Sequence, residues 1–526
     1  MIDFYDTLTH IGYIKEILNH TSNQTMENIK YPLLHILASE LILISSYNIQ
    51  SIVYIIPGVY TITYILGMRA LAGVIFPNKN VEDISIIAGI VSLPLGIQLF
   101  APWSAAISII PLVLFIYYLS SSTKRHWAIL ALLLLASVFI HIILSILVSI
   151  IILAFLAGHI LIWRTGNIFD INSCRKINTF NMYELIRNDV VVVATVLLFA
   201  FPWLFHSYDL QIRANLTVFL SSFLGSGGFS STPQTGGTTS FLQKNLSLLR
   251  KADLSVFGFI QVFWFHRGRF LILYMVPIIS ALYLFADFSL SKLNSLRDLI
   301  DIFNLYLIFA TLSVASLISS GPPFSVIGLG RFTPIVYVCS GVSIIYMYIN
   351  SLSNDKSGWK REVTGLMKII FVLALISTLI FTMHPSPIRE KSNPGGTEMR
   401  VEGTTWYFEV GQQNNRFEIY TNTSPISRYE DYYYGKYHNV GVPVLKNGLI
   451  PDKFGYQNHT TLSSALNNNG NKTYVLFTER DRVHHKVYGD NETGRSYPKS
   501  SRVQLRTDPT VNKLYTNGEV EWWIIY

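Results

Sequence analysis

The feature that most constrains this chain is a series of long apolar runs. Ten of them are long enough, at about 17 to 25 residues, to cross a hydrocarbon core of roughly 30 Å as helices. Half of all residues are hydrophobic and only 14% are charged, so the chain is more apolar than soluble domains. Lipid offers the backbone no hydrogen-bond partners, so these runs predict a helical bundle rather than a barrel. The expected spans are residues 49–70, 83–100, 103–121, 126–143, 145–163, 188–206, 269–286, 301–319, 332–350 and 364–383.

Charged residues give these expected spans an orientation. Basic residues gather in the loops that begin at Lys124, Arg164, Lys292 and Lys356, and the positive-inside rule places such loops in the cytoplasm. The formal charge of +8 therefore needs no nucleic acid to explain it. All eight Asn-X-Ser/Thr sequons fall in segments assigned to the exterior, where sequons can be glycosylated. They begin at Asn19, Asn23, Asn215, Asn245, Asn422, Asn458, Asn471 and Asn491. The sequence thus predicts a multi-pass protein of the cell membrane.

This topology divides the chain into three parts. Residues 1–48 form a first exterior loop, residues 49–383 form the bundle, and residues 384–526 form an extracytoplasmic domain. A second exterior loop, residues 207–268, interrupts the bundle and is rich in Gly, Ser and Thr. The short apolar stretch 31–47 is expected to be an interfacial or partly inserted helix, with an ordinary span as the alternative.

The C-terminal part has the signature of a separate polar domain. The runs TTWYFEV (404–410), KTYVLFTE (472–479) and VEWWIIY (520–526) predict strands. Asn517 and Gly518 stand between alternating residues and predict a β-hairpin. The fold class expected is therefore mainly α, a polytopic bundle of about ten spans with a β-rich or α+β domain at its end. The two cysteines, Cys174 and Cys339, make a disulfide framework implausible.

The opening run DFYDTLTHIGYIKEI, residues 3–17, carries the first candidate chemistry. On a helix, Asp3, Asp6 and His10 follow one another at spacings of three and four, so their side chains share one face. A carboxylate beside an imidazole can act as a general base with its orienting partner. Asp6 and His10 can equally ligate a divalent metal, Mg²⁺ or Mn²⁺, that neutralises phosphate. The alternative is a solvated polar face on an exposed N-terminal helix.

Cations at the expected exterior face form a second candidate site. His266 and Arg269 belong to the run HRGR, and Arg331 follows GPPFSVIGLG. Guanidinium groups match phosphate oxygens with a planar fork, so these residues are candidates for binding a lipid phosphate. Interfacial anchoring by snorkelling is the alternative. His35, which is near the opening run in sequence, could join these cations, and an interfacial histidine with satisfied hydrogen bonds is the simpler reading. The sequence has no phosphate-binding Gly-rich loop, HExxH site or serine elbow, so soluble nucleotide chemistry is unsupported.

Several segments together resemble the membrane-embedded glycosyltransferases of the GT-C fold, especially archaeal members with a polyprenyl-phosphate-sugar donor. An acidic exterior run precedes Tyr-Pro-x-x-His, an inserted helix, a multispan bundle and a polar C-terminal domain. The sequence segments that carry the resemblance are DTLTHIGYIKEIL with YPLLHIL, HPSPIREKSNPGGTEMRVEGTTWYF (384–408), PDKFGY (451–456) and DPTVNKLYTNGEVEWWII (508–525). The resemblance also implies a first transmembrane helix before the acidic run, and we expect that helix to be missing from this sequence.

The resemblance implies a reaction and roles for the candidate residues. A sugar would move from a polyprenyl (dolichyl) phosphate or diphosphate to an acceptor glycan, lipid or protein at the outer face, by single displacement with inversion. Asp6 fits the family's acidic residue best, with Asp3 as the alternative and His10 as its neighbour. Arg331 and Arg269, with His266, are the candidates for the donor phosphate on their position alone.

Other functions remain open on the sequence. Within the enzyme class, an oligosaccharyltransferase that uses a whole lipid-linked glycan is the second reading. A transporter of lipid-linked glycans would carry its polar residues within the spans, whereas here the ionisable groups gather at one face. A non-catalytic assembly protein would need the bundle only as an anchor, and ten spans exceed that need.

Overall fold

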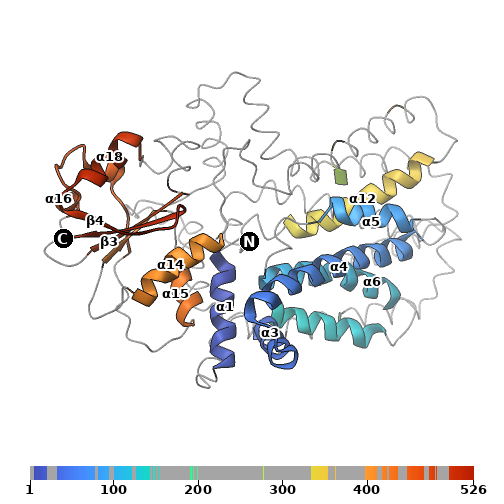
Figure 1. The fold of residues 1–526 in the computed structure, drawn as a ribbon. Coiled ribbons are helices and arrows are strands. Elements are labelled where there is room, and N and C mark those ends of the chain that lie inside the picture. Colours follow the sequence, from blue (N-terminus) through green and yellow to red (C-terminus); the bar gives the residue numbers. More distant parts are fainter. Residues whose placement is uncertain are drawn as a thin grey trace, which may run out of the picture.

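A computed structural model gives the fold. It describes residues 5–19, 32–76, 81–93, 100–120, 126–141, 333–352, 397–410, 418–422, 426–435, 447–466, 473–479 and 497–526, with a few isolated positions between them. Two groups of elements result, one helical and one built on a sheet, and the first helix of the chain stands between them (Figure 1).

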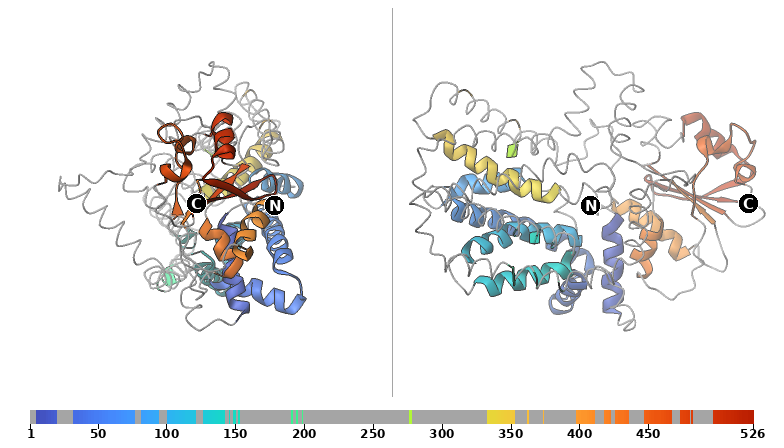
Figure 2. Two further views of the ribbon diagram at one scale, coloured as in Figure 1. Left: turned by 60° about the vertical axis from the view of Figure 1, so that its left-hand side comes forward. Right: turned by 180° about the vertical axis from the view of Figure 1, so that it is seen from behind.

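The helical group is the N-terminal and central part of the described chain. Its helices are α1 (Tyr5–Leu18), α3 (Pro32–Ser45), α4 (Ile49–Ile75), α5 (Glu82–Val91), α6 (Pro102–Ser120) and α12 (Thr333–Leu352), with a further helical stretch at His126–His141. The longest, α4, packs against α3, α5, α6 and α12 (Figure 2). Tyr60, Tyr64 and Met68 of α4 are buried in the shared apolar core. Asn48 caps the helix, since its side chain accepts a hydrogen bond from the Ser51 amide at 2.7 Å.

The predicted spans can be compared with this bundle where the structure describes it. Helices α4, α6 and α12 coincide with the expected spans 49–70, 103–121 and 332–350, and His126–His141 with 126–143. Within the described residues, α4 alone is long and apolar enough to cross a membrane by length and composition. Most or all of the spans 145–163, 188–206, 269–286, 301–319 and 364–383 and of loop 207–268 lies outside the described residues.

One span prediction is wrong in its extent. The expected helix 83–100 ends at Val91, because Ser92 and Leu93 already leave the helical conformation. Leu93 precedes Pro94, and a residue before proline is disfavoured in the α region. The end is also held in place by Tyr64, whose hydroxyl donates to the Ser92 carbonyl at 3.2 Å.

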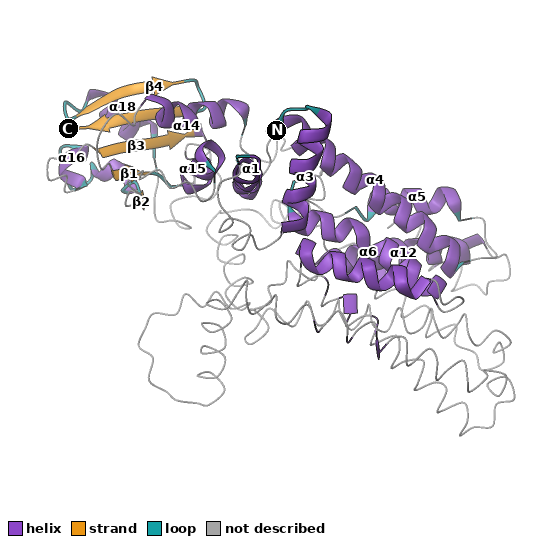
Figure 3. Ribbon diagram, turned by 90° about the horizontal axis from the view of Figure 1, so that it is seen from below, coloured by secondary structure: helices purple, strands orange, loops and turns teal. Residues whose placement is uncertain are grey.

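The C-terminal group is a five-stranded mixed sheet with helices on both faces. Its elements are α14 (Glu398–Val410), β1 (Glu418–Tyr420), α15 (Ile426–Tyr434), β2 (Asn447–Gly448), the short 3₁₀ helix η5 (Asp452–Gly455), α16 (Leu462–Ala465), β3 (Thr473–Thr478), α18 (Lys499–Thr507), β4 (Val511–Thr516) and β5 (Val520–Ile525). The strand order is β2-β1-β3-β5-β4; β1 runs parallel to β2 and β3, and the other pairs are antiparallel (Figure 3). Of the two readings left open, this is the α+β one.

Successive side chains of the central strands β3 and β5 point to opposite faces of the sheet, so the domain has two apolar cores. Leu476 of β3 and Trp522 of β5 face α14 and α15, whereas Phe477 and Trp523 face η5, α16 and α18. Every residue of β3 and β5 is buried, as expected for strands covered on both faces. The domain is therefore a three-layer structure around two apolar clusters.

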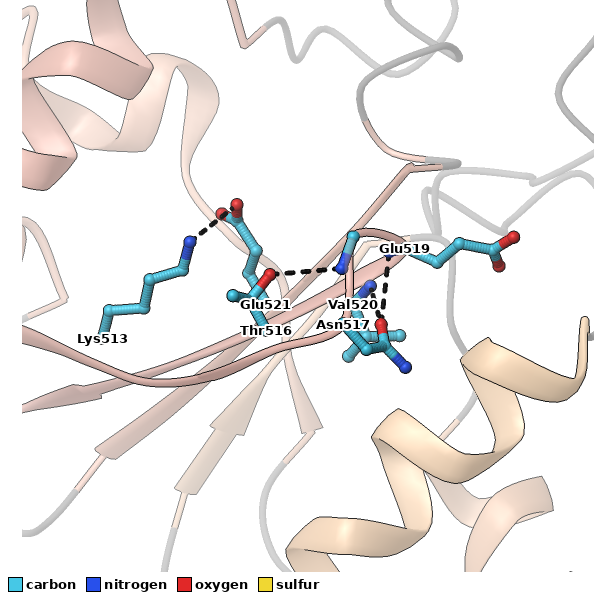
Figure 4. A network of polar contacts seen from close by, with 7 residues as sticks. Lys513, Thr516, Asn517, Glu519, Val520 and Glu521 are labelled. Atoms are coloured by element: carbon cyan, nitrogen blue, oxygen red, sulfur yellow. Dashed lines mark hydrogen bonds and ion pairs between the residues drawn. The ribbon is translucent and has the colours of Figure 1, made fainter.

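The predicted hairpin is confirmed at its exact position. The turn between β4 and β5 holds Asn517 and Gly518, and Gly518 has φ +91°, a value that glycine tolerates (Figure 4). The Asn517 side chain accepts hydrogen bonds from the amides of Glu519 and Val520, at 3.2 and 3.0 Å. Lys513 and Glu521 pair across the two strands at 3.0 Å.

One strand prediction is wrong. The run TTWYFEV lies in helix α14 and not in a strand. Aromatic residues favour strands in isolation, but here Tyr407 stacks on Trp522 of β5 with ring centroids 4.6 Å apart. The Trp522 indole N–H also donates to the Gly403 carbonyl at 2.7 Å. Packing of the whole helix on the sheet thus overrides the local preference. The runs 472–479 and 520–526 form β3 and β5 as predicted.

Candidate functional site

The candidate site is built around helix α1, which joins the two groups of elements. Leu8 belongs to the apolar core of the C-terminal domain, whereas Ile11 and Ile14 belong to the core of the bundle. The helix packs against α3 on one side and α15 on the other. The opening run is therefore helical, as predicted, and it is held between two partners that are distant in sequence.

Asp6 lies in the first turn of α1. Its side chain and the whole of Asp3 lie outside what the structure describes. The helical backbone keeps the predicted spacing of four residues between Asp6 and His10. The placement of the two carboxylates on one face with His10 stays a prediction.

His10 is paired with a second histidine. Its Nδ1 lies 3.0 Å from Nε2 of His35 on α3, so one ring donates and the other accepts. The ring of Tyr13 packs on His35 with centroids 5.0 Å apart. Burial lowers the pKa of His35 to about 3. Burial, together with the nearby charges of His35 and Arg428, lowers the pKa of His10 well below its usual value. Both imidazoles are therefore neutral at pH 7, and each ring offers one hydrogen-bond donor and one acceptor.

A polar link ties the same stretch of α1 to the C-terminal domain. The hydroxyl of Thr9 donates to the Asp431 carboxylate at 2.7 Å and accepts a hydrogen bond from the Arg428 guanidinium, also at 2.7 Å. Thr9 and Asp431 are buried, with 4% and 6% of their surfaces exposed. Hydrogen bonds to charged groups are stronger than neutral ones, and in a buried place they are costly to leave unmade.

Farther along α1, Lys15 binds the end of helix α15. Its ammonium group donates to the Tyr432 carbonyl at 2.6 Å and lies 4.6 Å from the centre of the Tyr432 ring. A cation at a helix C-terminus complements the helix dipole. Together with the buried Thr7 and Thr9, this contact shows that α1 is packed against its neighbours along these positions. The exposure of the face that carries Asp3 and Asp6 lies outside the described side chains.

Among the predicted site residues, the structure brings together only His10 and His35. His266, Arg269 and Arg331 lie outside the described residues, so the donor-phosphate site stays a prediction. No group of three or more potential metal ligands gathers within the described part of the chain. Two neutral imidazoles suit Mn²⁺ or Zn²⁺ better than Mg²⁺, but one nitrogen of each ring, Nδ1 of His10 and Nε2 of His35, is already engaged in the bond between them. The described residues therefore do not by themselves form a metal site.

Sequence reasoning missed the residues that connect α1 to the domain. Arg428 and Asp431 stand three residues apart in a Tyr-rich helix, a spacing that places both on one face. That spacing was the available signal, but it does not name Thr9 as the partner, more than 400 residues away.

Two of the segments that carry the family resemblance have a structural role. Tyr456 of PDKFGY donates to the carboxylate of Asp508, the first residue of DPTVNKLYTNGEVEWWII, at 2.8 Å. Asp508 also accepts from the Leu462 amide at 2.7 Å and from the Thr510 hydroxyl at 2.7 Å. These residues hold η5, α16 and β4 together, so they explain the fold of the domain rather than its chemistry.

Comparisons with known proteins give no family. No family model matches the sequence, and no curated protein sequence matches it. Solved structures that share similarity include the Archaeoglobus fulgidus oligosaccharyltransferase tethered with an acceptor peptide containing the NVT sequon via a disulfide bond (TM-score 0.45, 13% identity, 93% of this chain and 67% of that chain).

A second structure of the Archaeoglobus fulgidus enzyme, in complex with Zn and sulfate, gives a TM-score of 0.49 at 13% identity, over 98% of this chain and 69% of that one. The third is the archaeal oligosaccharyltransferase AglB from Archaeoglobus fulgidus in complex with an inhibitory peptide and a dolichol-phosphate (TM-score 0.48, 12% identity, 99% of this chain and 70% of that one). Likeness at these identities and TM-scores assigns no role to any residue of this chain.

Proposed function

We propose that this chain is a multi-pass glycosyltransferase of the cell membrane. It would move a sugar from a polyprenyl-phosphate-linked donor to an acceptor at the outer face, with inversion. The observation that carries the proposal is helix α1, which holds Asp6 in its first turn and His10 of a neutral His10–His35 pair in its middle, and which is fixed between the bundle and the polar domain. The resemblance of the same segments to GT-C glycosyltransferases supports it.

The reaction is a single displacement at the anomeric carbon. The acceptor group attacks that carbon while the bond to the phosphate oxygen breaks, and the phosphate leaves with the electron pair. Asp6 takes the proton of the acceptor group, and the neutral His10 orients it. Arg331, Arg269 and His266 stabilise the negative charge that develops on the departing phosphate. These roles are part of the proposal.

Two donors suit this chemistry. One is a polyprenyl phosphate that carries a single sugar, and the other is a lipid-linked whole glycan, as an oligosaccharyltransferase would use. The three solved structures named above are oligosaccharyltransferases, which agrees with the second reading. A transfer experiment with both kinds of donor distinguishes the two readings.

The experiment uses the full chain in liposomes with three labelled donors: a polyprenyl-phosphate monosaccharide, a polyprenyl-diphosphate oligosaccharide and a nucleotide sugar. We expect label on a glycan or peptide acceptor from one of the lipid-linked donors and none from the nucleotide sugar. The anomeric configuration of the product, read by NMR, should be opposite to that of the donor. Label that crosses the bilayer while still attached to lipid would instead identify a transporter and overturn the proposal.

A further inference from the structure

We propose that helix α15 of the C-terminal domain sets the position of the acidic start of α1, with Thr9 and Gly12 as positioning residues. This inference rests on the proposed function, because it assigns to the domain a role in the reaction of the α1 site. In this view the domain does not only bind a partner; it completes the site by fixing where Asp6 stands.

The first support is the close approach of the two helices at Gly12. A Cβ atom at this position would lie 2.5 Å from the carbonyl oxygen of Asp431 and 3.4 Å from its Cβ. Any side chain at Gly12 must therefore push α1 away from the backbone of α15. Glycine is required here by the distance between the two backbones, and the contact fixes their separation.

The second support is the polar link one turn earlier on the helix. Thr9 donates to Asp431 and accepts from Arg428, so both bonds of its hydroxyl go to α15. Asp431 thus meets α1 twice, through its carboxylate at Thr9 and through its backbone at Gly12. Two contacts on successive turns determine both the rotation and the translation of α1 along α15.

The third support is the distribution of apolar contacts around α1. Leu8 is fully buried in the core of the C-terminal domain, next to Thr9 and two residues after Asp6. Ile11 and Ile14 are buried in the core of the bundle. Leu8 and Thr9, which follow Asp6 by two and three positions, therefore contact the domain. Thr7, by contrast, donates to the Phe100 carbonyl of the bundle at 3.4 Å. Since Asp6 precedes Thr9 by less than one turn of a rigid helix, displacement of Thr9 displaces Asp6.

The test compares two glycine-to-alanine variants of the full chain in liposomes. Gly12→Ala introduces the clash with Asp431, whereas Gly73→Ala on α4 places its Cβ where no atom lies within 4 Å. We expect Gly12→Ala to lower kcat about tenfold or more, at an unchanged KM for the lipid-linked donor, because a small misplacement of a catalytic group costs rate rather than binding. Gly73→Ala should keep the wild-type kcat.

A second pair of variants covers the case in which Gly12→Ala does not fold. Thr9→Ser keeps a hydroxyl for both Asp431 and Arg428, and Thr9→Val removes it at nearly the same volume. We expect Thr9→Ser to retain kcat within about twofold and Thr9→Val to lose about tenfold, with faster hydrogen exchange of the α1 amides in Thr9→Val alone. The conservative variant thus separates positioning from a general loss of structure.

The outcomes distinguish this inference from the proposed function. If the wild-type chain transfers sugar and both Gly12→Ala and Thr9→Val keep its kcat, the positioning role is overturned and the proposed function stands. If the wild-type chain transfers nothing from any lipid-linked donor, the proposed function fails, and the positioning role fails with it. A loss of kcat that is confined to Gly12→Ala and Thr9→Val supports both the positioning role and the proposed function.

Discussion

The bundle and the C-terminal domain are held together by different kinds of contact. In the bundle, several described serines bond to a carbonyl of their own helix, as Ser39 does with His35 and Ser340 with Val336. In the domain, buried polar groups bond across elements, as Trp522 does with Gly403 and Tyr497 with Ile450. The bundle therefore depends mainly on apolar packing and close helix contacts, and the domain on specific side-chain bonds between distant segments.

Helix α1 shows what this difference means for the site. It contributes Ile11 and Ile14 to the apolar packing of the bundle, and Thr9 to a polar link with the domain. A defect in either part should reach Asp6 by a different route. Changes in the domain should alter the position of α1, whereas changes in the bundle should alter the packing beneath it.

The largest expected effect is the loss of the aromatic centre of the domain. Trp522→Ala removes a fully buried indole, its stacking on Tyr407 and its hydrogen bond to Gly403. We expect the free energy of unfolding of the domain to fall by about 3–5 kcal/mol. Hydrogen exchange of the β3 amides in the full chain measures this, and exchange of the α4 amides should change little.

Trp406→Ala is the matched control for that variant. Trp406 is only partly buried and stacks on Tyr515 at the edge of the same cluster. We expect a clearly smaller loss than for Trp522→Ala. Equal losses for the two tryptophans would contradict the view that the buried Trp522 is the centre of the domain. Equal destabilisation of the bundle and the domain by Trp522→Ala would contradict the view that the two parts are separately stabilised.

The next effect concerns the buried carboxylate of Asp508. Although burial raises its pKa, hydrogen bonds from Thr510, Leu462 and Tyr456 outweigh that effect and leave the pKa below its usual value. The folded domain thus stabilises the ionised form of the Asp508 carboxylate. The resulting contribution to the free energy of unfolding is present above the unfolded pKa of about 3.9 and disappears as the pH falls through the folded pKa. We expect Asp508→Asn to cost about 1–3 kcal/mol of unfolding free energy at pH 7.

The pH dependence of that cost is the sharper measurement. The difference in unfolding free energy between wild type and Asp508→Asn should shrink below about pH 4, because the unfolded chain then binds a proton that the folded carboxylate takes up only at lower pH. Urea unfolding of the full chain at several pH values gives the difference directly. A difference that stays constant from pH 7 to pH 3 would show that Asp508 acts through its shape and not through its charge.

The smallest effect tests the close helix contacts of the bundle. A Cβ at Gly67 of α4 would lie 3.1 Å from both the Leu112 amide nitrogen and the Pro111 Cβ of α6. Gly67→Ala should therefore destabilise the bundle by about 1 kcal/mol. Gly73→Ala, which meets no atom within 4 Å, should be neutral or stabilising by up to about 1 kcal/mol, because alanine favours helix. A thermal unfolding series compares the two, and an identical shift for both would exclude a close contact at Gly67.

The same contrast explains which parts of the fold could be predicted. The hydropathy and length of the apolar runs predict α4, α6 and α12 well, because apolar packing is what stabilises these helices. The Asn517–Gly518 hairpin is predictable because its turn chemistry is local. The local sequence of helix α14 favours a strand, and its helical conformation depends on Tyr407 packing against a strand that comes more than 100 residues later.

The candidate site was predictable only in part, for the same physical reason. The spacing of Asp6 and His10 is a local property of the helix, so the sequence reveals it. The pairing of His10 with His35 joins two helices close in sequence, but the sequence indicates His35 only as a partner of the cations at the exterior face. The contacts of Thr9 with Arg428 and Asp431 depend on how the domain docks on α1. No local pattern encodes that docking.

The most direct measurement of the central claim is sugar transfer by Asp6→Asn in liposomes, with donor binding measured on the same preparation. The substitution keeps the size of the side chain and removes its ability to accept a proton. The account predicts that transfer falls by at least about a hundredfold, the usual contribution of a general base, while the lipid-linked donor still binds with wild-type affinity. Transfer at the wild-type rate by Asp6→Asn would contradict it.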